Sequence, residues 1–136
     1  VSVPRPVDQN RHAILMEKFE GVELARASFP PEQVVAVCDL VLREVRDAYE
    51  AGYIHCDMSQ HNVAVAESGV TVFDWPQAVA TDHENAAELL ERDVENVVSY
   101  FQQKNPGEMP DEVDYRALAD AIRETGEFGG VETFAN

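Results

Sequence analysis

The chain has 136 residues, 45% of them hydrophobic, a size that suits one domain with a core of its own. Its 10 basic and 26 acidic residues leave a net charge of −16. Because no basic patch can displace counterions, we predict no direct nucleic-acid binding. The charge has two interpretations. It indicates adaptation to a salty cytoplasm, where a Debye length of about 3 Å at molar salt screens the repulsion, or an acidic piece of a larger protein.

Targeting and redox signals are sparse. No run approaches about eighteen apolar residues, so we expect no membrane span. The N-terminal residues lack the profile of a signal peptide, and the missing initial Met leads us to expect a start inside a longer gene product. The cysteines, Cys38 and Cys56, are too few for a disulfide scaffold or a structural zinc site. We therefore predict a reducing, cytoplasmic location.

The predicted elements begin with a Pro-rich connector at residues 1–11 and a short apolar strand at residues 12–17. Residues 23–28 are predicted to form a turn of helix. Pro31 then starts a helix that runs to Gly52, because apolar residues recur at steps of three and four. At 1.5 Å per residue, this helix is about 30 Å long.

The second half of the chain is predicted to hold a β-hairpin and two further helices. Strands at 63–66 and 70–73 flank a loop at 67–69, and helices follow from about Asn85 to Gln103 and from Asp111 or Asp114 to Thr125. The tail 126–136 is Gly-rich and is predicted to fray.

A candidate metal site follows from the predicted hairpin. With a three-residue loop, cross-strand partners have numbers that sum to 136, so Asn62 stands opposite Asp74 with Cβ atoms about 4.5–5.5 Å apart. A two-residue loop shifts the register by one and leaves the two as neighbours. Amide and carboxylate oxygens suit Mg²⁺, which keeps its other positions for water and phosphate. Asp57, in the preceding loop, is placed to orient an attacking oxygen and accept its proton.

These residues form the pattern H-x-D-x-x-x-x-N at residues 55–62, followed by a strand, a turn and a strand that ends in Asp74. The pattern resembles the catalytic loop and metal-binding Asp of the protein-kinase-like superfamily. Ser59 two residues after Asp57, the D-W-P-Q sequence at 74–77 and the E-R-D-V-E-N-V sequence at 91–97 are similar to the RIO family of atypical kinases, second type. The net charge of −16 favours an archaeal, and specifically haloarchaeal, member of that family. The likeness covers roughly residues 3–105.

The resemblance implies a role for several residues. Asp57 is the catalytic Asp, and Asn62 and Asp74 are Mg²⁺ ligands, with Asp74 also a candidate to take the γ-phosphoryl group as an aspartyl-phosphate. ATP contacts are expected at four positions: Met16, Glu17, Phe19 and Ser59. Trp75 and Cys56 are expected to pack, and His61 and His83 to be solvated. Asp93, with Arg92, either braces the catalytic loop from below or forms a surface pair.

The resemblance also implies an architecture. The expected fold is α+β, a protein-kinase-like C-terminal lobe, mainly helical, with the β-hairpin carrying the metal site. Residues 1–20 are the end of the N-lobe and the hinge strand, and residues 21–136 are the C-terminal lobe. The winged helix and Gly-rich lobe lie outside this chain, because its seven glycines never form G-x-G-x-x-G. Without the phosphate-clamping lobe, the isolated chain is expected to be nearly inactive.

The expected function is an ATP- and Mg²⁺-dependent serine/threonine kinase or ATPase that acts in small-ribosomal-subunit maturation, with the pre-small ribosomal subunit as partner. The loop between Asp74 and His83 is too short for a segment that docks a substrate peptide, which favours an ATPase-like switch. One alternative is a small-molecule phosphotransferase of the aminoglycoside or choline kinase kind. Another is a non-catalytic kinase fragment that binds a partner.

Overall fold

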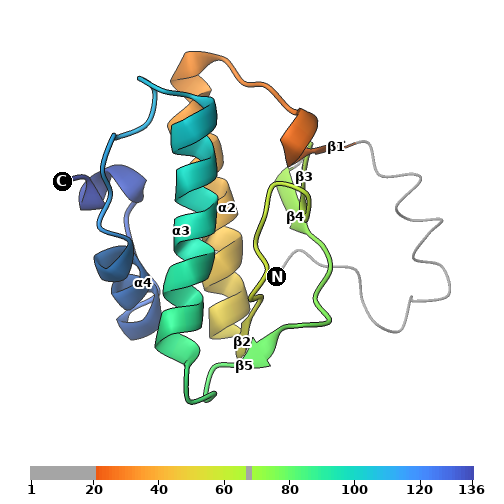
Figure 1. Cartoon of the computed structure of the whole chain (residues 1–136), viewed down its shortest axis with the longest axis vertical. Helices are drawn as coiled ribbons and strands as arrows, with labels where there is room; N and C mark the ends of the chain where they lie inside the picture. The colour runs from red at the N-terminus through yellow and green to blue at the C-terminus, as the bar shows by residue number, and fades with distance from the viewer. Residues whose placement is uncertain (1–20, 67–68) are drawn as a thin grey trace, which may run out of the picture.

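Three helices form the centre of the fold: α2 (Val34–Glu50), α3 (Ala86–Lys104) and α4 (Tyr115–Glu124). The computed structural model describes residues 21–66 and 69–136, and α3 lies between α2 and α4 within it (Figure 1). The predicted connector, the strand at 12–17 and the nucleotide contacts Met16, Glu17 and Phe19 fall outside the described residues.

The helices form where apolar residues recur on one face, and all three predicted helices are confirmed. In α2 the buried side chains are Val34, Val37, Cys38, Val41, Leu42, Glu44, Val45 and Ala48. A short 3₁₀ turn, η3 (Pro31–Gln33), precedes this helix and explains its predicted start at Pro31. In α4 the Asp114 carboxylate accepts the amide of Ala117 at 3.0 Å and so caps the helix.

Two small sheets lie beside the helices. Strands β1 (Val22–Glu23), β3 (Val63–Ala66) and β4 (Gly69–Val72) form one sheet in the order β1-β3-β4 (Figure 1). Strands β2 (Tyr53–Ile54) and β5 (Val79–Ala80) pair antiparallel as the second sheet, which was not predicted. The helical turn predicted within 23–28 is confirmed as the 3₁₀ helix η2 (Leu24–Arg26).

The register of the β3–β4 hairpin differs from the prediction. Val63 pairs with Val72 and Ala66 with Gly69, so partner numbers sum to 135 rather than 136. Gly69 belongs to strand β4 and not to the loop. Asn62 therefore faces Phe73, whose amide donates to the Asn62 carbonyl at 2.7 Å, and the predicted direct opposition of Asn62 and Asp74 is wrong.

The predicted fraying of the tail 126–136 is also wrong. Phe128 is 5% exposed and Val131, which begins the 3₁₀ helix η4 (Val131–Phe134), is fully buried. The Asp39 carboxylate of α2 accepts the Val131 amide at 2.8 Å, and Asp114 donates its amide to the Phe134 carbonyl at 2.9 Å. The tail thus closes over α2 and the start of α4.

One core joins the helices to the hairpin. Its largest fully buried side chains come from α2, α3, α4, strand β2, the hairpin and the loop between β2 and β3, and they include Phe101, Leu42, Ile54, Met58, Leu90 and Leu118. No helix within residues 21–66 and 69–136 has the length and hydropathy that a bilayer crossing requires.

Candidate active site

The loop between β2 and β3 is held through its backbone by a buried carboxylate of α3. Asp93 is 1% exposed, and it accepts the amide of Cys56 at 2.9 Å and the amide of Met58 at 3.4 Å. Burial raises the pKa of Asp93 above its ordinary value of 3.8, and the two amide hydrogen bonds offset only part of this rise. Of the two roles considered for this residue, the structure supports the brace of the loop.

Cys56 shows why the loop needs a brace. Its backbone φ is +72°, in the left-handed region that non-glycine residues rarely adopt. The hydrogen bond from its amide to Asp93 holds this conformation and turns the next residue, Asp57, toward solvent.

His55 ties this loop to the segment that carries Asp74. Its ring is 2% exposed, and its Nδ1 accepts the amide of Asp57 at 3.1 Å. Its Nε2 therefore carries the proton and donates to the carbonyl of Phe73 at 2.7 Å. Trp75 packs edge-on against the His55 ring, with the two ring centroids 4.7 Å apart, which agrees with its expected packing role. Its indole N–H donates to the Val72 carbonyl at 3.0 Å.

The Asp57 carboxylate is exposed and is held by two side-chain amides. Gln77 donates to its Oδ2 at 2.8 Å, and Asn62 donates to the same atom at 3.4 Å and to the Asp57 carbonyl at 2.8 Å. A carboxylate with one oxygen engaged in this way keeps its orientation, and its other oxygen remains able to accept a proton. The structure thus brings the predicted pair Asp57 and Asn62 together.

Asp74 lies two residues after the end of β4 and is exposed, with a backbone φ of +57°. Asn62 is 7% exposed and turns its amide nitrogen toward Asp57, so its amide oxygen is available as a ligand for a cation. One carboxylate and one amide oxygen at adjoining strand ends are hard ligands, so their chemistry fits Mg²⁺.

A hollow of about 310 Å³ opens beside Asp57. Its lining is uncharged apart from Asp57 and includes Ser59, Gln60, Asn96, Ser99 and Gln103. Ser59, expected to contact the nucleotide, thus lines the same space as Asp57.

Sequence reasoning gave no role to Gln77 or to the α3 residues that line this hollow. Gln77 was noted only as part of the D-W-P-Q pattern, yet its amide is 2.8 Å from the Asp57 carboxylate. Asn96, Ser99 and Gln103 lie on α3 at steps of three and four, and this spacing is the signal that a polar stripe faces one site.

The α+β fold of the described residues is kinase-like. Two crystal structures of the Rio2 kinase from Chaetomium thermophilum, one described as an ADP/Mg²⁺-phosphoaspartate complex, match 86% of the chain with TM-scores of 0.57 and 0.58. Sequence identity is 20% and 19%, so this likeness shows the fold alone.

The family model of the RIO domain matches residues 1–117, and the chain belongs to this family. The chain is 39% identical over 127 residues to the RIO-type serine/threonine-protein kinase Rio2 of Methanocaldococcus jannaschii, covering 90% of the chain and 47% of the relative. It is 35% identical to the rio2 kinase of Schizosaccharomyces pombe, over 74% of the chain and 29% of the relative. Rio1 of Haloferax volcanii is 33% identical over 76% of the chain and 37% of the relative. The chain spans about half or less of the length of these relatives.

Proposed function

We propose that this chain is the catalytic-loop part, the C-terminal lobe, of a RIO-type ATP phosphotransferase of the second type. One observation carries the proposal: the Asp57 carboxylate is oriented by the amides of Gln77 and Asn62 at the open end of the hairpin that leads into Asp74. This arrangement supports an acid–base role for Asp57 and a metal-binding role for Asn62 and Asp74, the two functions that phosphoryl transfer needs.

In the proposed reaction, Asn62 and Asp74 hold Mg²⁺, which neutralises charge on the phosphates of ATP when it is bound. Asp57 orients the attacking hydroxyl or water and accepts its proton through the carboxylate oxygen that Gln77 leaves free. His55 keeps the loop and the Asp74 segment in register, because one ring bonds both backbones.

Asp74 has a second proposed role. A solved relative is described as a phosphoaspartate complex, and we extend that chemistry to the exposed Asp74 carboxylate. Its oxygen bonds to the γ-phosphorus of ATP while the bond to the β-phosphate oxygen breaks, and ADP leaves with that electron pair. Water then hydrolyses the aspartyl-phosphate.

The wider assignments rest on the family resemblance. We propose that residues 1–20 complete the N-lobe and hinge, with Met16, Glu17 and Phe19 against adenine. We further propose a cytoplasmic role in small-ribosomal-subunit maturation, with the pre-small subunit as partner, in a halophilic archaeon. Membership of the RIO domain family does not favour the small-molecule phosphotransferase.

The test is Mg²⁺-dependent ATP hydrolysis by the longest gene product that contains this chain. Asp57→Asn should lower kcat by about 10²- to 10⁴-fold, the scale of a positioned acid–base group, while leaving the fold intact. Asp82→Asn is the matched control, because Asp82 is an exposed carboxylate of the loop after β5, with no hydrogen bond to the site among the described residues. An unchanged rate in Asp57→Asn would remove Asp57 from the mechanism.

Two further measurements separate the alternatives. Label from γ-labelled ATP should be released by hydroxylamine and should disappear in Asp74→Asn; acid-stable, hydroxylamine-resistant label would contradict an acyl-phosphate. Efficient phosphorylation of choline or an aminoglycoside would instead support the small-molecule phosphotransferase.

A further inference from the structure

Two hollows adjoin along one face of α3, and the first of them lies beside Asp57. The hollow at Asp57 has a volume of about 310 Å³, and the second, of about 490 Å³, includes Lys104 at the C-terminal end of the helix. The two hollows share three lining residues: Gln60, Tyr100 and Gln103. They therefore form one groove that runs from Asp57 to Lys104, called the α3 groove below.

The Lys104 end of the α3 groove holds a positive charge in a fixed place. The Lys104 ammonium donates to the Ala27 carbonyl and, at 3.0 Å, to the Tyr100 hydroxyl. That hydroxyl in turn donates to the Leu24 carbonyl at 3.1 Å. None of the ion pairs within residues 21–66 and 69–136 includes Lys104. Because an ammonium has three N–H donors and two are used, one remains for an anionic group.

The middle of the α3 groove is polar and uncharged. The side chains of Gln60 and Gln103 make no hydrogen bond to any other described residue, so their amides can donate to and accept from a ligand. His61 also lines the Lys104 end, and it contacts Glu23 with Nδ1 and Oε1 2.9 Å apart. Side-chain amides along a groove suit the backbone of an extended polypeptide, which offers N–H and C=O groups in turn.

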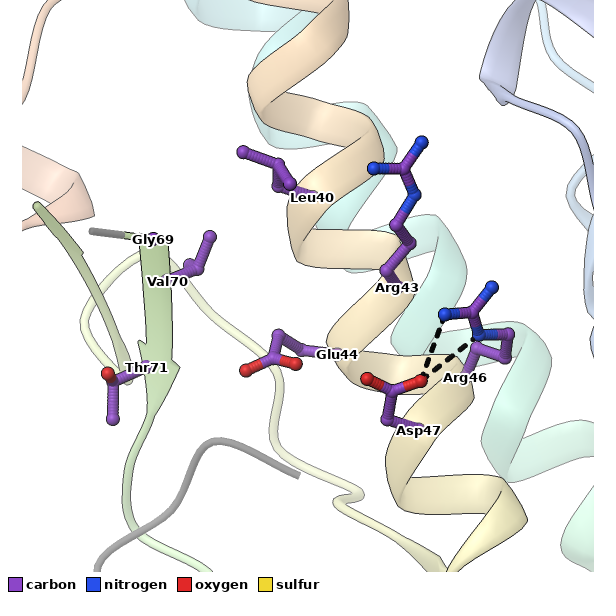
Figure 2. A pocket seen from close by; sticks show the side chains of 8 residues that line it. All are labelled: Leu40, Arg43, Glu44, Arg46, Asp47, Gly69, Val70 and Thr71. Carbon is purple, nitrogen blue, oxygen red and sulfur yellow. Dashed lines mark hydrogen bonds and ion pairs between the residues drawn. The ribbon is translucent and has the colours of Figure 1, made fainter. Parts of the chain in front are cut away.

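A hollow on another side of α2 has a different charge pattern. It has a volume of about 440 Å³, and its charged lining residues are Arg43, Glu44, Arg46 and Asp47. Figure 2 shows the Arg46 guanidinium turned to the Asp47 carboxylate, with Nη2 and Oδ1 3.0 Å apart. Cations and carboxylates are equal in number there. The hollow that contains Lys104, by contrast, has no carboxylate among its described lining residues.

We propose that the α3 groove binds the acceptor of phosphoryl transfer, an extended polypeptide segment with a serine or threonine hydroxyl at Asp57 and an acidic side chain paired with Lys104. This inference rests on the proposed function, because it takes Asp57 as the group that receives the hydroxyl proton. Asn96, which lines the Asp57 end, precedes Lys104 by eight positions on α3, or about 12 Å along the helix. An extended segment covers this length in about three to four residues. The acidic residue is therefore expected about three residues from the hydroxyl.

In the proposed transfer, the acceptor hydroxyl takes the place of the attacking water. Its oxygen bonds to the γ-phosphorus of ATP, and its proton passes to Asp57. The bond from the γ-phosphorus to the β-phosphate oxygen breaks, and ADP leaves with that electron pair. The short segment between Asp74 and His83 is not needed to dock the acceptor, because α3 and the loop between β2 and β3 supply the surface.

The test compares three synthetic peptides as acceptors for the longest gene product that contains this chain, with Mg²⁺ and γ-labelled ATP. Each peptide has one serine, with Glu, Gln or Lys placed three residues away on both sides. KM for the Glu peptide should be about fivefold below KM for the Gln peptide, with kcat little changed, the scale of one solvent-facing ion pair. The net charge of −16 by itself favours the Lys peptide, so a preference for Glu requires a local contact.

Two substitutions assign this preference to Lys104. Lys104→Gln should abolish the difference in KM between the Glu and Gln peptides, and Lys104→Glu should give the lowest KM to the Lys peptide. Arg116→Gln is the matched control, because Arg116 is an exposed cation of α4 that lines neither hollow. This control should keep the fivefold preference for Glu.

Failure of this inference is distinct from failure of the proposed function. Equal KM for the Glu and Gln peptides, or a preference for Lys, would overturn the inference, and this comparison uses the unaltered protein, so it holds even if Lys104→Gln does not fold. ATP hydrolysis without label on any peptide would overturn it too, while leaving the proposed function in place. Absence of ATP hydrolysis would contradict both. A preference for Glu that persists in Lys104→Gln would contradict the pairing with Lys104.

Discussion

Asp93 is the residue on which the shape of the candidate active site most depends. Its carboxylate accepts two backbone amides of the loop that carries Asp57, although it comes from α3, more than thirty positions away in the chain. Asp93→Asn keeps the size of the side chain and one acceptor oxygen but places a donor against the other amide. We expect a loss of about 1–3 kcal/mol in the free energy of unfolding, measured by urea denaturation.

The control for this substitution is Arg92→Gln, because Arg92 is the exposed neighbour on the same helix. Its free energy of unfolding should stay within about 0.5 kcal/mol of the parent value. Equal losses in the free energy of unfolding for the two variants would contradict a specific stabilising role of the Asp93 brace.

The raised pKa of Asp93 gives the same comparison a dependence on pH. Because burial raises the pKa, the folded state holds the Asp93 proton to a higher pH than the unfolded state, so this contribution is present in full below the ordinary value of 3.8 and is lost as pH rises through the folded pKa. The stability of the parent protein relative to Asp93→Asn should therefore increase as pH falls from 7 toward 4. A difference that shrinks on acidification would contradict a raised pKa.

At the scale of elements, the helices were the most predictable part of the fold. Their apolar periodicity places α2, α3 and α4 to within a few residues, because burial of one helix face is a local property of the sequence. The hairpin register was not predictable in the same way. A loop of two residues and a loop of three both suit E-S-G, and the choice decides whether Asn62 faces Phe73 or Asp74.

The ordered packing of the tail 126–136 was not predicted, because its glycines outweighed the apolar residues between them. Phe128, Val131 and Phe134 are spaced by three, and this apolar spacing was the available signal. Val131→Ala should lower the free energy of unfolding by about 2 kcal/mol, since two buried methyl groups are lost and a cavity remains.

Glu132→Ala is the control for the tail, because Glu132 is the exposed neighbour of Val131. Urea denaturation should show a change within about 0.5 kcal/mol for it. A tail that frays in solution would make both variants indistinguishable from the parent protein.

At the scale of the whole molecule, charge is the dominant property. A net charge of −16 on 136 residues repels itself, and salt screens this repulsion as the Debye length falls from about 10 Å at 0.1 M to about 3 Å at 1 M. The urea midpoint should therefore rise between 0.1 M and 1 M KCl. A midpoint that falls over this range would contradict adaptation to a salty cytoplasm.

The candidate site shows a similar division between what the sequence revealed and what it did not. Asp57, Asn62 and Asp74 could be proposed from their spacing, because the loop and the hairpin that follows it are continuous in the chain. Gln77 needs the fold, since the D-W-P-Q segment must turn back before its amide meets Asp57.

The anchoring of the loop by Asp93 has an evolutionary consequence. Asp93 accepts hydrogen bonds from backbone N–H groups, which every residue except proline possesses, so a change of side chain at Cys56 or Met58 does not by itself remove these hydrogen bonds. Proline is the exception, because it has no amide hydrogen to offer. The shape of the loop is thus fixed through its backbone, while the burial of Met58 and the left-handed φ of Cys56 restrict which side chains suit these two positions.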